Sequence, residues 1–405
     1  MSITLLTDIG QLALPRPRAG TSRTPVDIIE DAAILIRDGE VVARGPRVDI
    51  ESDLPKDTTT LSCEGRAVVP GLVDSHTHAV FAGQRVDEFL RRGRGESYEE
   101  IAAAGGGIRN TAKAFEEGDL ETVISESTKR IERLFQLGTT TLEVKTGYGL
   151  TVDAEQKHLK AILETKAQVR PELMVTLLAH VPPKEGSSVD YLTSLAKEFE
   201  EHLPQLDFID IFVESTAFSP DDARHFRGLI PQEIPLKLHV DQLHDGAGAA
   251  LAAELNALSA DHLEFTSESG MRALSDAGVV GTILPGCGIF LHGSRWPDAR
   301  RMRECGVELA VATDLNPGSS HMENLWMCGV AASTQCGLTL EESFWGMTRG
   351  GALALGRPEL GLLDEKATAN LLVMDSDHWA SGLYSPHAAP IHQIWMKGVP
   401  VSGKS

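Results

Sequence analysis

The stretch Val69-Pro70-Gly71-Leu72-Val73-Asp74-Ser75-His76-Thr77-His78 decides the fold, because an apolar run with strand character ends in two histidines spaced one residue apart. Alternate side chains of an extended segment point to the same side, so His76 and His78 can face one point. Two neutral imidazoles in that arrangement can bind one metal cation. Such a pair can also be two unrelated surface histidines, so the metal interpretation needs further ligands elsewhere in the chain.

The composition is that of a globular protein with a strong negative charge. The chain has 405 residues, 42% of them hydrophobic, with 37 basic and 58 acidic side chains and a formal net charge of −21. This length suits one large domain or two smaller ones with a substantial core. The charge argues against nucleic acid or an anionic membrane as partner, since both require a basic face. An anionic substrate would need a locally positive pocket.

The cysteines and the N-terminal stretch bear on the compartment. The five cysteines are scattered and form no CxxC pair, which argues against a disulfide framework or zinc ribbon and for reduced thiols. The first residues, MSITLLTDIGQ, lack the basic and apolar regions of a secretory signal. No apolar run approaches the roughly 18 residues of a membrane span. We therefore expect a cytoplasmic protein.

Both ends of the chain predict short strands. Residues 33–43 read as a hairpin around Asp38-Gly39, and residues 394–401 as a second hairpin around a Lys-Gly pair. We expect residues 1–68 and 356–405 to assemble together into one small, composite β-sandwich domain.

The long middle part, residues 69–355, alternates strand and helix patterns. Eight apolar, β-branched segments are candidate strands: 67–73, 139–145, 173–179, 207–213, 235–240, 257–262, 278–284 and 307–313. Most gaps between them carry a helical pattern. Eight such units favour an α/β fold of the (β/α)8 TIM-barrel type over a doubly wound sheet. The doubly wound alternative needs a glycine-rich phosphate loop after the first strand, where this chain has HTHAVFAG.

Polar residues follow nearly every predicted strand. In barrels of this type the chemistry lies at the C-terminal ends of the strands. The residues at these ends are His76, His78, Glu143, Lys145, His180, Glu214, His239, His262 and Asp314. Each has an ordinary explanation on its own, such as a core histidine, a helix cap or a salt bridge. Together they converge on one rim, which indicates a functional site.

Three imidazoles and one carboxylate suit a single first-row metal with an open position for water. We predict that His76, His78, His239 and Asp314 are the ligands. A metal held in this way activates water at neutral pH. Asp314 can take a proton from that water and pass it to a leaving nitrogen, and His262 can orient the water or polarise a carbonyl. The predicted reaction is hydrolysis at a carbon bonded to nitrogen.

Several motifs resemble those of a known family. PGLVDSHTH, with the later His, His and Asp, resembles the amidohydrolase superfamily, and AAAGGGI, EVKTGYGL and ATDLNPGSS are similar to the imidazolonepropionase family within it. The resemblance implies one divalent or trivalent metal ion per subunit, zinc or iron, and a homodimer. It implies hydrolysis of the ring amide of a small anionic imidazolone, 4-imidazolone-5-propanoate, to N-formimidoyl-L-glutamate in histidine degradation.

The resemblance also implies the same four metal ligands and a set of substrate contacts. These contacts are Arg85, Tyr98, Tyr148, His180, Gln242, Asn316, Gly318 and Ser319. An arginine can bind the propionate of the substrate with two hydrogen bonds. Gln242 can hydrogen-bond the substrate but cannot transfer a proton, which leaves that work to Asp314 and His262. We expect Lys145 to have a structural or substrate-orienting role in a site with one metal.

Two alternative functions remain open at this stage. A related amidohydrolase could open another cyclic amide or deaminate a heterocycle, although Arg85 with Tyr148 favours an anionic substrate over neutral bases. A non-catalytic scaffold with this fold is the second alternative. Scaffolds of this kind usually lose metal ligands, and this chain keeps all four.

Overall fold

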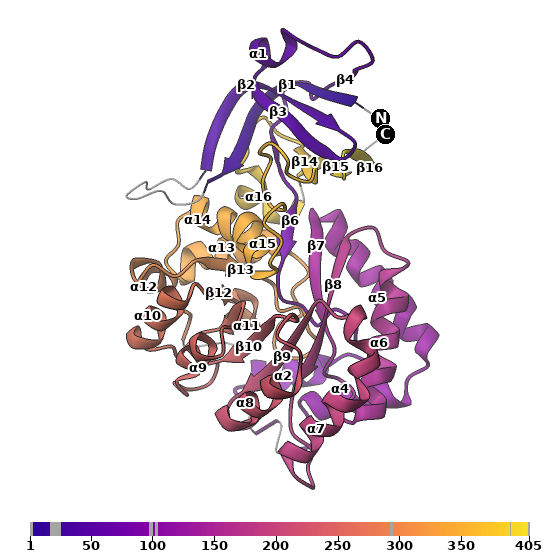
Figure 1. The fold of residues 1–405 in the computed structure, drawn as a ribbon, viewed down its shortest axis with the longest axis vertical. Helices are drawn as coiled ribbons and strands as arrows, with labels where there is room; N and C mark the ends of the chain where they lie inside the picture. Colours follow the sequence, from indigo (N-terminus) through magenta and orange to yellow (C-terminus); the bar gives the residue numbers. More distant parts are fainter. Residues whose placement is uncertain are drawn as a thin grey trace.

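The structure, a computed structural model, describes residues 3–16, 26–96, 100–101, 104–291, 295–388 and 390–403. The named strands form two separate eight-stranded sheets, one above the other in Figure 1. Within the described residues no helix is both long and apolar enough to cross a membrane. The predicted combination of a barrel with a second β-rich unit is confirmed.

The larger unit is a parallel barrel whose strands follow one another in sequence order. They are β6 (Leu72–Asp74), β7 (Thr139–Lys145), β8 (Glu172–Ala179), β9 (Phe208–Val213), β10 (Leu236–Val240), β11 (Ser259–His262), β12 (Val280–Ile283) and β13 (Leu309–Val311). Just beyond β6 and β13 the backbone N–H of Asp314 donates to the carbonyl of His76 at 3.0 Å, and that of His78 donates to Leu315 at 2.9 Å. These two hydrogen bonds join the first strand to the last and close the barrel.

Helices cover the outside of the barrel in Figure 1. They include α2 (Val86–Gly93), α4 (Ile108–Glu117), α5 (Leu120–Gln136), α6 (Val152–Lys166), α7 (Ser188–Glu198), α8 (Pro220–Leu229), α9 (Gly248–Glu254), α10 (Glu268–Ala277), α11 (Pro285–Phe290) and α12 (Ala299–Glu304). Several begin after a side chain that accepts a hydrogen bond from the first turn, as Asp119, Ser219 and Ser267 do. A short 3₁₀ segment, η1 (Glu200–Gln205), follows α7.

Further helices lie between the barrel and the second sheet in Figure 1. They are α13 (Leu325–Gln335), α14 (Leu340–Trp345), the π-helical turn η2 (Gly346–Gly350) and α15 (Gly351–Ala354). Trp326 of α13 is fully buried and stacks on Phe344 of α14, with ring centroids 6.4 Å apart. Both residues belong to the same apolar core as barrel residues and residues of β14 and β15, so these helices join the two units.

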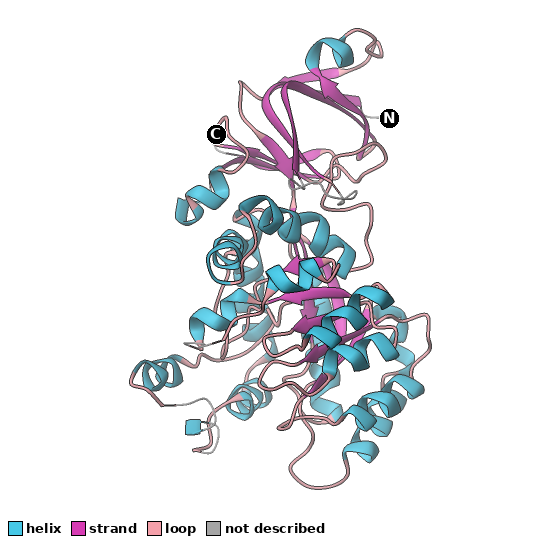
Figure 2. Ribbon diagram, turned by 90° about the vertical axis from the view of Figure 1, so that its left-hand side faces the viewer, coloured by secondary structure: helices cyan, strands magenta, loops and turns pink. Residues whose placement is uncertain are grey.

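The second sheet, here called the terminal sheet, is built from both ends of the chain. Its order is β16 (Val399–Gly403), β15 (Ile391–Met396), β14 (Leu371–Met374), β5 (Val68–Pro70), β1 (Ile3–Pro15), β2 (Val26–Arg37) and β3 (Glu40–Pro46), and β4 (Thr59–Ser62) also pairs with β1. Its strands curve around a common interior in Figure 2, filled by Leu6, Ile34, Leu371 and Trp395. Three short helices, α1 (Arg47–Glu51), α16 (Ser381–Tyr384) and η3 (Pro386–Ala388), flank it.

Both predicted hairpins are present in the terminal sheet. Their turns have positive φ at both central residues, 48° and 90° at Asp38-Gly39 and 47° and 73° at Lys397-Gly398. Such turns match the twist of the flanking strands. The domain limits at 68/69 and 355/356 remain a proposal.

The prediction of a single barrel strand over residues 67–73 was wrong. The chain is divided at Gly71, so that β5 belongs to the terminal sheet and only β6 belongs to the barrel. A Cβ atom on Gly71 would lie 2.3 Å from Oγ1 of Thr140 on β7, so only glycine lets the backbone pass here. The chain therefore crosses from sheet to barrel within one residue, shortly before His76 and His78.

Asp74 and Thr313 reinforce the closure of the barrel. The buried Asp74 carboxylate accepts the backbone N–H of Thr313 at 3.0 Å and its hydroxyl at 2.6 Å. Burial raises the pKa of Asp74 to about 7. A carboxylate buried this deeply depends on its donors, so the pair is sensitive to the loss of either hydrogen bond.

We expect Thr313→Val to lower the free energy of unfolding by about 1–3 kcal/mol, because it removes the hydroxyl donor to buried Asp74 at nearly constant volume. Thr282→Val on β12 is the matched control, since the buried Thr282 hydroxyl has no hydrogen-bond partner among the described residues. We expect that control to change stability by less than about 0.5 kcal/mol. Urea denaturation followed by circular dichroism compares the two, and equal stability would contradict the closing role of Asp74.

Candidate metal centre and active site

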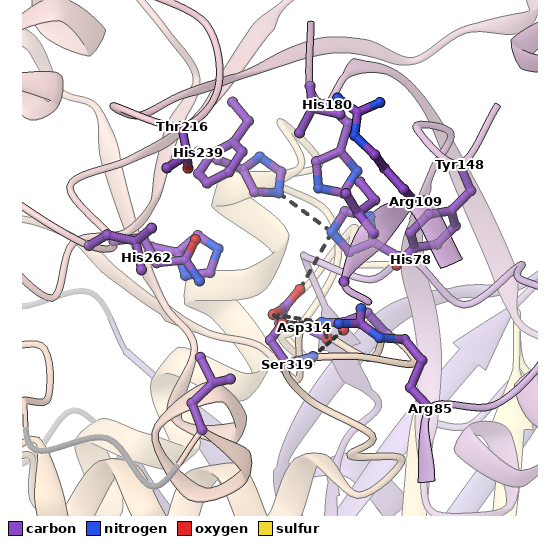
Figure 3. A pocket seen from close by; sticks show the side chains of 18 of the residues that line it. His78, Arg85, Arg109, Tyr148, His180, Thr216, His239, His262, Asp314 and Ser319 are labelled. Carbon is purple, nitrogen blue, oxygen red and sulfur yellow. Dashed lines mark hydrogen bonds and ion pairs between the residues drawn. The ribbon is translucent and has the colours of Figure 1, made fainter. Parts of the chain in front are cut away.

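The four predicted metal ligands meet at the C-terminal end of the barrel. His76 and His78 follow β6, His239 lies in β10, and Asp314 follows β13. Asp314 Oδ1 is 3.5 Å from His76 Nε2 and 3.4 Å from His78 Nε2, and the Nε2 atoms of His78 and His239 are 3.5 Å apart. Figure 3 shows His78, His239 and Asp314 directed at one another. Four ligand atoms from distant parts of the sequence thus surround one point.

The chemistry of these atoms fits a metal ion. Burial lowers the pKa of His76, His78 and His239 well below the ordinary value, which keeps the imidazoles neutral. His76 Nε2 is buried without a hydrogen-bond partner among the described residues, although a buried nitrogen of this kind normally has one. Three neutral imidazoles with a carboxylate oxygen are a donor set that zinc and iron accept.

Carboxylates lie behind two of the imidazoles. Asp261 Oδ2 lies 2.6 Å from His76 Nδ1, and Asp210 Oδ2 lies 2.9 Å from His239 Nδ1. The His76 contact is a hydrogen bond that fixes the tautomer and the ring, so that Nε2 faces the other proposed ligands, whereas the His239 contact lacks hydrogen-bond geometry. Neither aspartate was predicted as a site residue. Their signal in the sequence is an acidic residue inside an apolar strand, in FIDIF and in SADH.

The two aspartates belong to a buried charge layer, which we define as Glu143, Lys145, Asp210, Lys237 and Asp261, all fully buried. Lys145 Nζ lies 2.8 Å from Glu143 Oε1 and 2.7 Å from Asp210 Oδ2, and Lys237 Nζ lies 3.1 Å from Glu143 Oε2. Burial by itself would lower the pKa of Lys145, but Asp210 and Glu143 raise it above its ordinary value. Lys145 is therefore an ammonium that binds the carboxylates together, which supports its structural role.

The loop after β13 holds the Asp314 carboxylate from the other side. Asp314 Oδ2 accepts Cys287 Sγ–H at 2.7 Å and Asn316 Nδ2–H at 2.9 Å, while Oδ1 faces the histidines. Burial raises the pKa of Asp314 to about 6, which suits a group that exchanges protons near neutral pH. Burial also raises the pKa of the Cys287 thiol, which remains a donor. This contact of Cys287 was missed from the sequence, because it joins α11 to the loop after β13.

His262 ends β11 beside the proposed ligands. Its ring centroid is 5.8 Å from that of His76 and 5.5 Å from that of His239. Burial alone would lower the pKa of His262, but the Glu264 carboxylate, 3.6 Å from Nδ1, raises it above the ordinary value. His262 can therefore present a donor on the same rim as the metal ligands.

A cavity of about 360 Å³ opens onto this rim, a size that suits a small molecule. The predicted site residues that line it are His78, His239, Asp314, His262, Arg85, Tyr148, His180, Gln242, Asn316 and Ser319. Gly318 lies against Arg85, because a Cβ atom on it would be 1.9 Å from Arg85 Nη1. Tyr98 falls outside the described residues.

Tyr148 and His180 form one wall of the cavity. The His180 ring stacks on His78 with centroids 5.3 Å apart and an interplanar angle of 17°. Burial lowers the pKa of His180 to about 4, so its ring is neutral. The Tyr148 turn is held by Glu155, which accepts the backbone N–H groups of Gly147 at 2.8 Å and Gly149 at 2.7 Å.

The side-chain amide of Asn316 forms hydrogen bonds within the loop that begins at this residue. Its Oδ1 accepts the backbone N–H groups of Gly318 at 2.8 Å and Ser319 at 2.7 Å. Its Nδ2 donates to Asp314 and to Ser319 Oγ. This pattern supports a role in shaping the loop.

Sequence reasoning missed several residues of the cavity wall, namely Arg109, Phe212, Thr216 and Leu291. Arg109 had a usable signal, because it directly follows the glycine-rich motif AAAGGGI. The apolar members had none, since an apolar residue near a strand end also fits the core.

Comparison with known proteins identifies the family of this chain. Residues 67–404 match the amidohydrolase family. A curated imidazolonepropionase from Methylobacterium nodulans is 39% identical over 384 residues, which covers 93% of this chain and 96% of the relative. The imidazolonepropionase of Deinococcus radiodurans is also 39% identical, over 98% of this chain and 99% of its own.

Solved structures show the same fold at much lower identity. The guanine deaminase of E. coli superposes with a TM-score of 0.74 at 16% identity, and each chain is covered completely. A triazine hydrolase variant also gives a TM-score of 0.74, at 17% identity, over 99% of this chain and 95% of its own. With the motifs and the relatives, these findings show that the chain belongs to the amidohydrolase family and, within it, to the imidazolonepropionase family.

Proposed function

We propose that this hydrolase opens the ring amide of 4-imidazolone-5-propanoate to give N-formimidoyl-L-glutamate. One observation supports the class of substrate, a small anion. In a chain of net charge −21, two arginines, Arg85 and Arg109, line the cavity beside the His₃Asp cluster. A positive cavity in an acidic protein favours a small anion. The family of the curated relatives supports the specific reaction.

We propose that His76, His78, His239 and Asp314 hold one metal ion, zinc or iron. When bound, the metal supplies Lewis acidity that activates water and polarises the ring carbonyl. The neutral imidazoles and the carboxylates behind them support this assignment. The donor set accepts either metal, so the metal's identity must be measured.

Proton transfer falls to Asp314 and His262. The Asp314 carboxylate accepts a proton from the attacking water and delivers it to the leaving ring nitrogen. The hydrogen bonds from Cys287 and Asn316 keep this carboxylate in place. His262 donates a hydrogen bond to the carbonyl oxygen as negative charge develops there.

The remaining polar residues of the cavity bind and orient the substrate. Arg85 contacts the propionate, with Tyr148, His180, Tyr98 and Ser319 as further contacts, and Gln242 only hydrogen-bonds. Gly318 allows the Arg85 guanidinium to approach the loop, and Asn316 fixes that loop. We also propose that the protein is a homodimer and that it is cytoplasmic, and the five free thiols support the second of these.

Deamination of a neutral heterocycle is the alternative that shares this fold, since one structural neighbour is a guanine deaminase. Arg109 argues against it, because a neutral ring in the cavity would leave this guanidinium without an anionic partner among the described residues.

The purified, metal-loaded protein is expected to hydrolyse 4-imidazolone-5-propanoate, measured as loss of the imidazolone absorbance, and to leave purines and pyrimidines unchanged. Metal analysis is expected to find about one ion per chain, as four ligands define one site. Turnover of a nucleobase without ring opening would refute the proposal. Absence of both metal and activity would favour a scaffold.

Asp314→Asn is expected to reduce turnover by at least about 100-fold, because the amide cannot carry the proton. Asp276→Asn, an exposed carboxylate on α10, is the control and is expected to keep full activity. Metal content measured on both proteins separates loss of the metal from loss of proton transfer. Activity of Asp314→Asn within a few-fold of the parent would exclude Asp314 as the proton carrier.

Cys287→Val is expected to lower kcat by about 10-fold, because Asp314 loses one of its hydrogen bonds. Cys287→Ser keeps a donor and is expected to retain activity within about 3-fold. Cys336→Val, also buried but away from Asp314, is the control for loss of a thiol. If valine and serine at 287 give the same kcat, the thiol does not position Asp314.

A further inference from the structure

The cavity contains two guanidinium groups with different surroundings. Arg85 Nε and Nη2 lie 2.8 Å and 2.6 Å from Glu88 Oε2, and both side chains are buried. The charge of Arg85 is therefore balanced within the protein. Such a group can still donate hydrogen bonds, but it adds little net attraction for an anion.

Arg109 has no comparable partner. Among the described residues, its guanidinium makes one hydrogen bond, of 3.4 Å, from Nη2 to the carbonyl oxygen of Pro182. No carboxylate of a described residue lies within ion-pair distance of its guanidinium, although the residue lines the cavity. Figure 3 shows Arg109 beside His180 and Tyr148, whereas Arg85 lies beside Ser319. The two cations therefore occupy different parts of the wall.

The position of Arg109 is fixed by the same carboxylate that balances Arg85. Glu88 Oε1 accepts the backbone N–H of Gly107 at 3.1 Å, directly before α4, and the Nδ2–H of Asn110 at 3.4 Å. Arg109 lies in the first turn of this helix. Glu88 thus binds the start of α4, which carries Arg109, and also pairs with Arg85. The positions of the two guanidinium groups relative to each other therefore depend on this one carboxylate.

The charge of the cavity wall follows from these contacts. Among the residues that the structure describes in this wall, the only carboxylate is Asp314, which is directed at the imidazoles, and the permanent cations are Arg85 and Arg109. With Arg85 balanced by Glu88, the excess positive charge comes from Arg109. A partly dehydrated cavity strengthens the attraction of this charge for an anion.

We propose that Arg109 is the residue that selects a carboxylate-bearing ligand over its neutral counterpart, while Arg85 supplies the directional hydrogen bonds. The identity of the substrate in this inference rests on the proposed function, but the preference for an anion does not. A variant without this charge should bind the anion more weakly and leave the chemical step intact.

The test uses equilibrium binding, which does not depend on turnover. Calorimetry on metal-loaded protein compares 3-(imidazol-4-yl)propanoate with the corresponding propanamide. We expect the parent to prefer the acid, and Arg109→Met to weaken binding of the acid by about 10- to 100-fold with little change for the amide. Arg109→Lys should restore part of the preference, and Arg37→Met, an exposed arginine of the terminal sheet, should behave as the parent.

Kinetics with 4-imidazolone-5-propanoate form the second arm. Arg109→Met is expected to raise KM with kcat within about 3-fold, because the contact is made in ground and transition states alike. An unchanged preference for the acid in Arg109→Met, or a parent that binds acid and amide equally, would overturn the inference. A parent that prefers the acid but does not open the ring would leave the inference standing and refute the proposed function.

Discussion

Neutral imidazoles at the centre of a barrel must be held by charges that are themselves buried, and this constraint governs the structure. Three carboxylates and two ammonium groups form the buried charge layer under the histidines. Removing one member leaves its neighbours as unpaired buried charges, which costs several kcal/mol. The layer therefore ties the geometry of the proposed metal ligands to five residues on four strands, β7, β9, β10 and β11.

The closure of the barrel also brings the proposed metal ligands together. His76 and His78 come from the first strand and Asp314 follows the last, so these ligands meet only when the edges of the sheet join. The backbone hydrogen bonds between the segments that follow β6 and β13 involve the ligand residues themselves. The hydrogen bonds between Thr313 and Asp74 reinforce this closure. Stability and ligand geometry thus depend on the same few contacts.

The sequence predicted the strands and the site residues that depend on local residue patterns. Strand periodicity with His or Asp at strand ends placed β7 to β13 and located His239, His262 and Asp314, because strand ends converge on one rim whatever the details of packing. The division of the predicted strand at Gly71 could not be predicted, because it depends on the pairing of β5 with β14, about 300 residues later. Cys287 could not be predicted as a site residue, because its role arises from a contact between distant segments that no local pattern records. Asp261 and Arg109 have local signals, the acidic residue in SADH and the position after AAAGGGI, but their roles depend on contacts with distant segments.

The pairing of β5 with β14 has a consequence for synthesis of the chain. Val69 lies opposite Leu372, and β15 and β16 extend the sheet beyond β14. The barrel strands, by contrast, are complete once Val311 has been made. During translation the barrel can close while one edge of β5 remains unpaired, and the terminal sheet is sealed only when residues 371–403 leave the ribosome. β5 is thus made long before β14, the last of its neighbours in the terminal sheet.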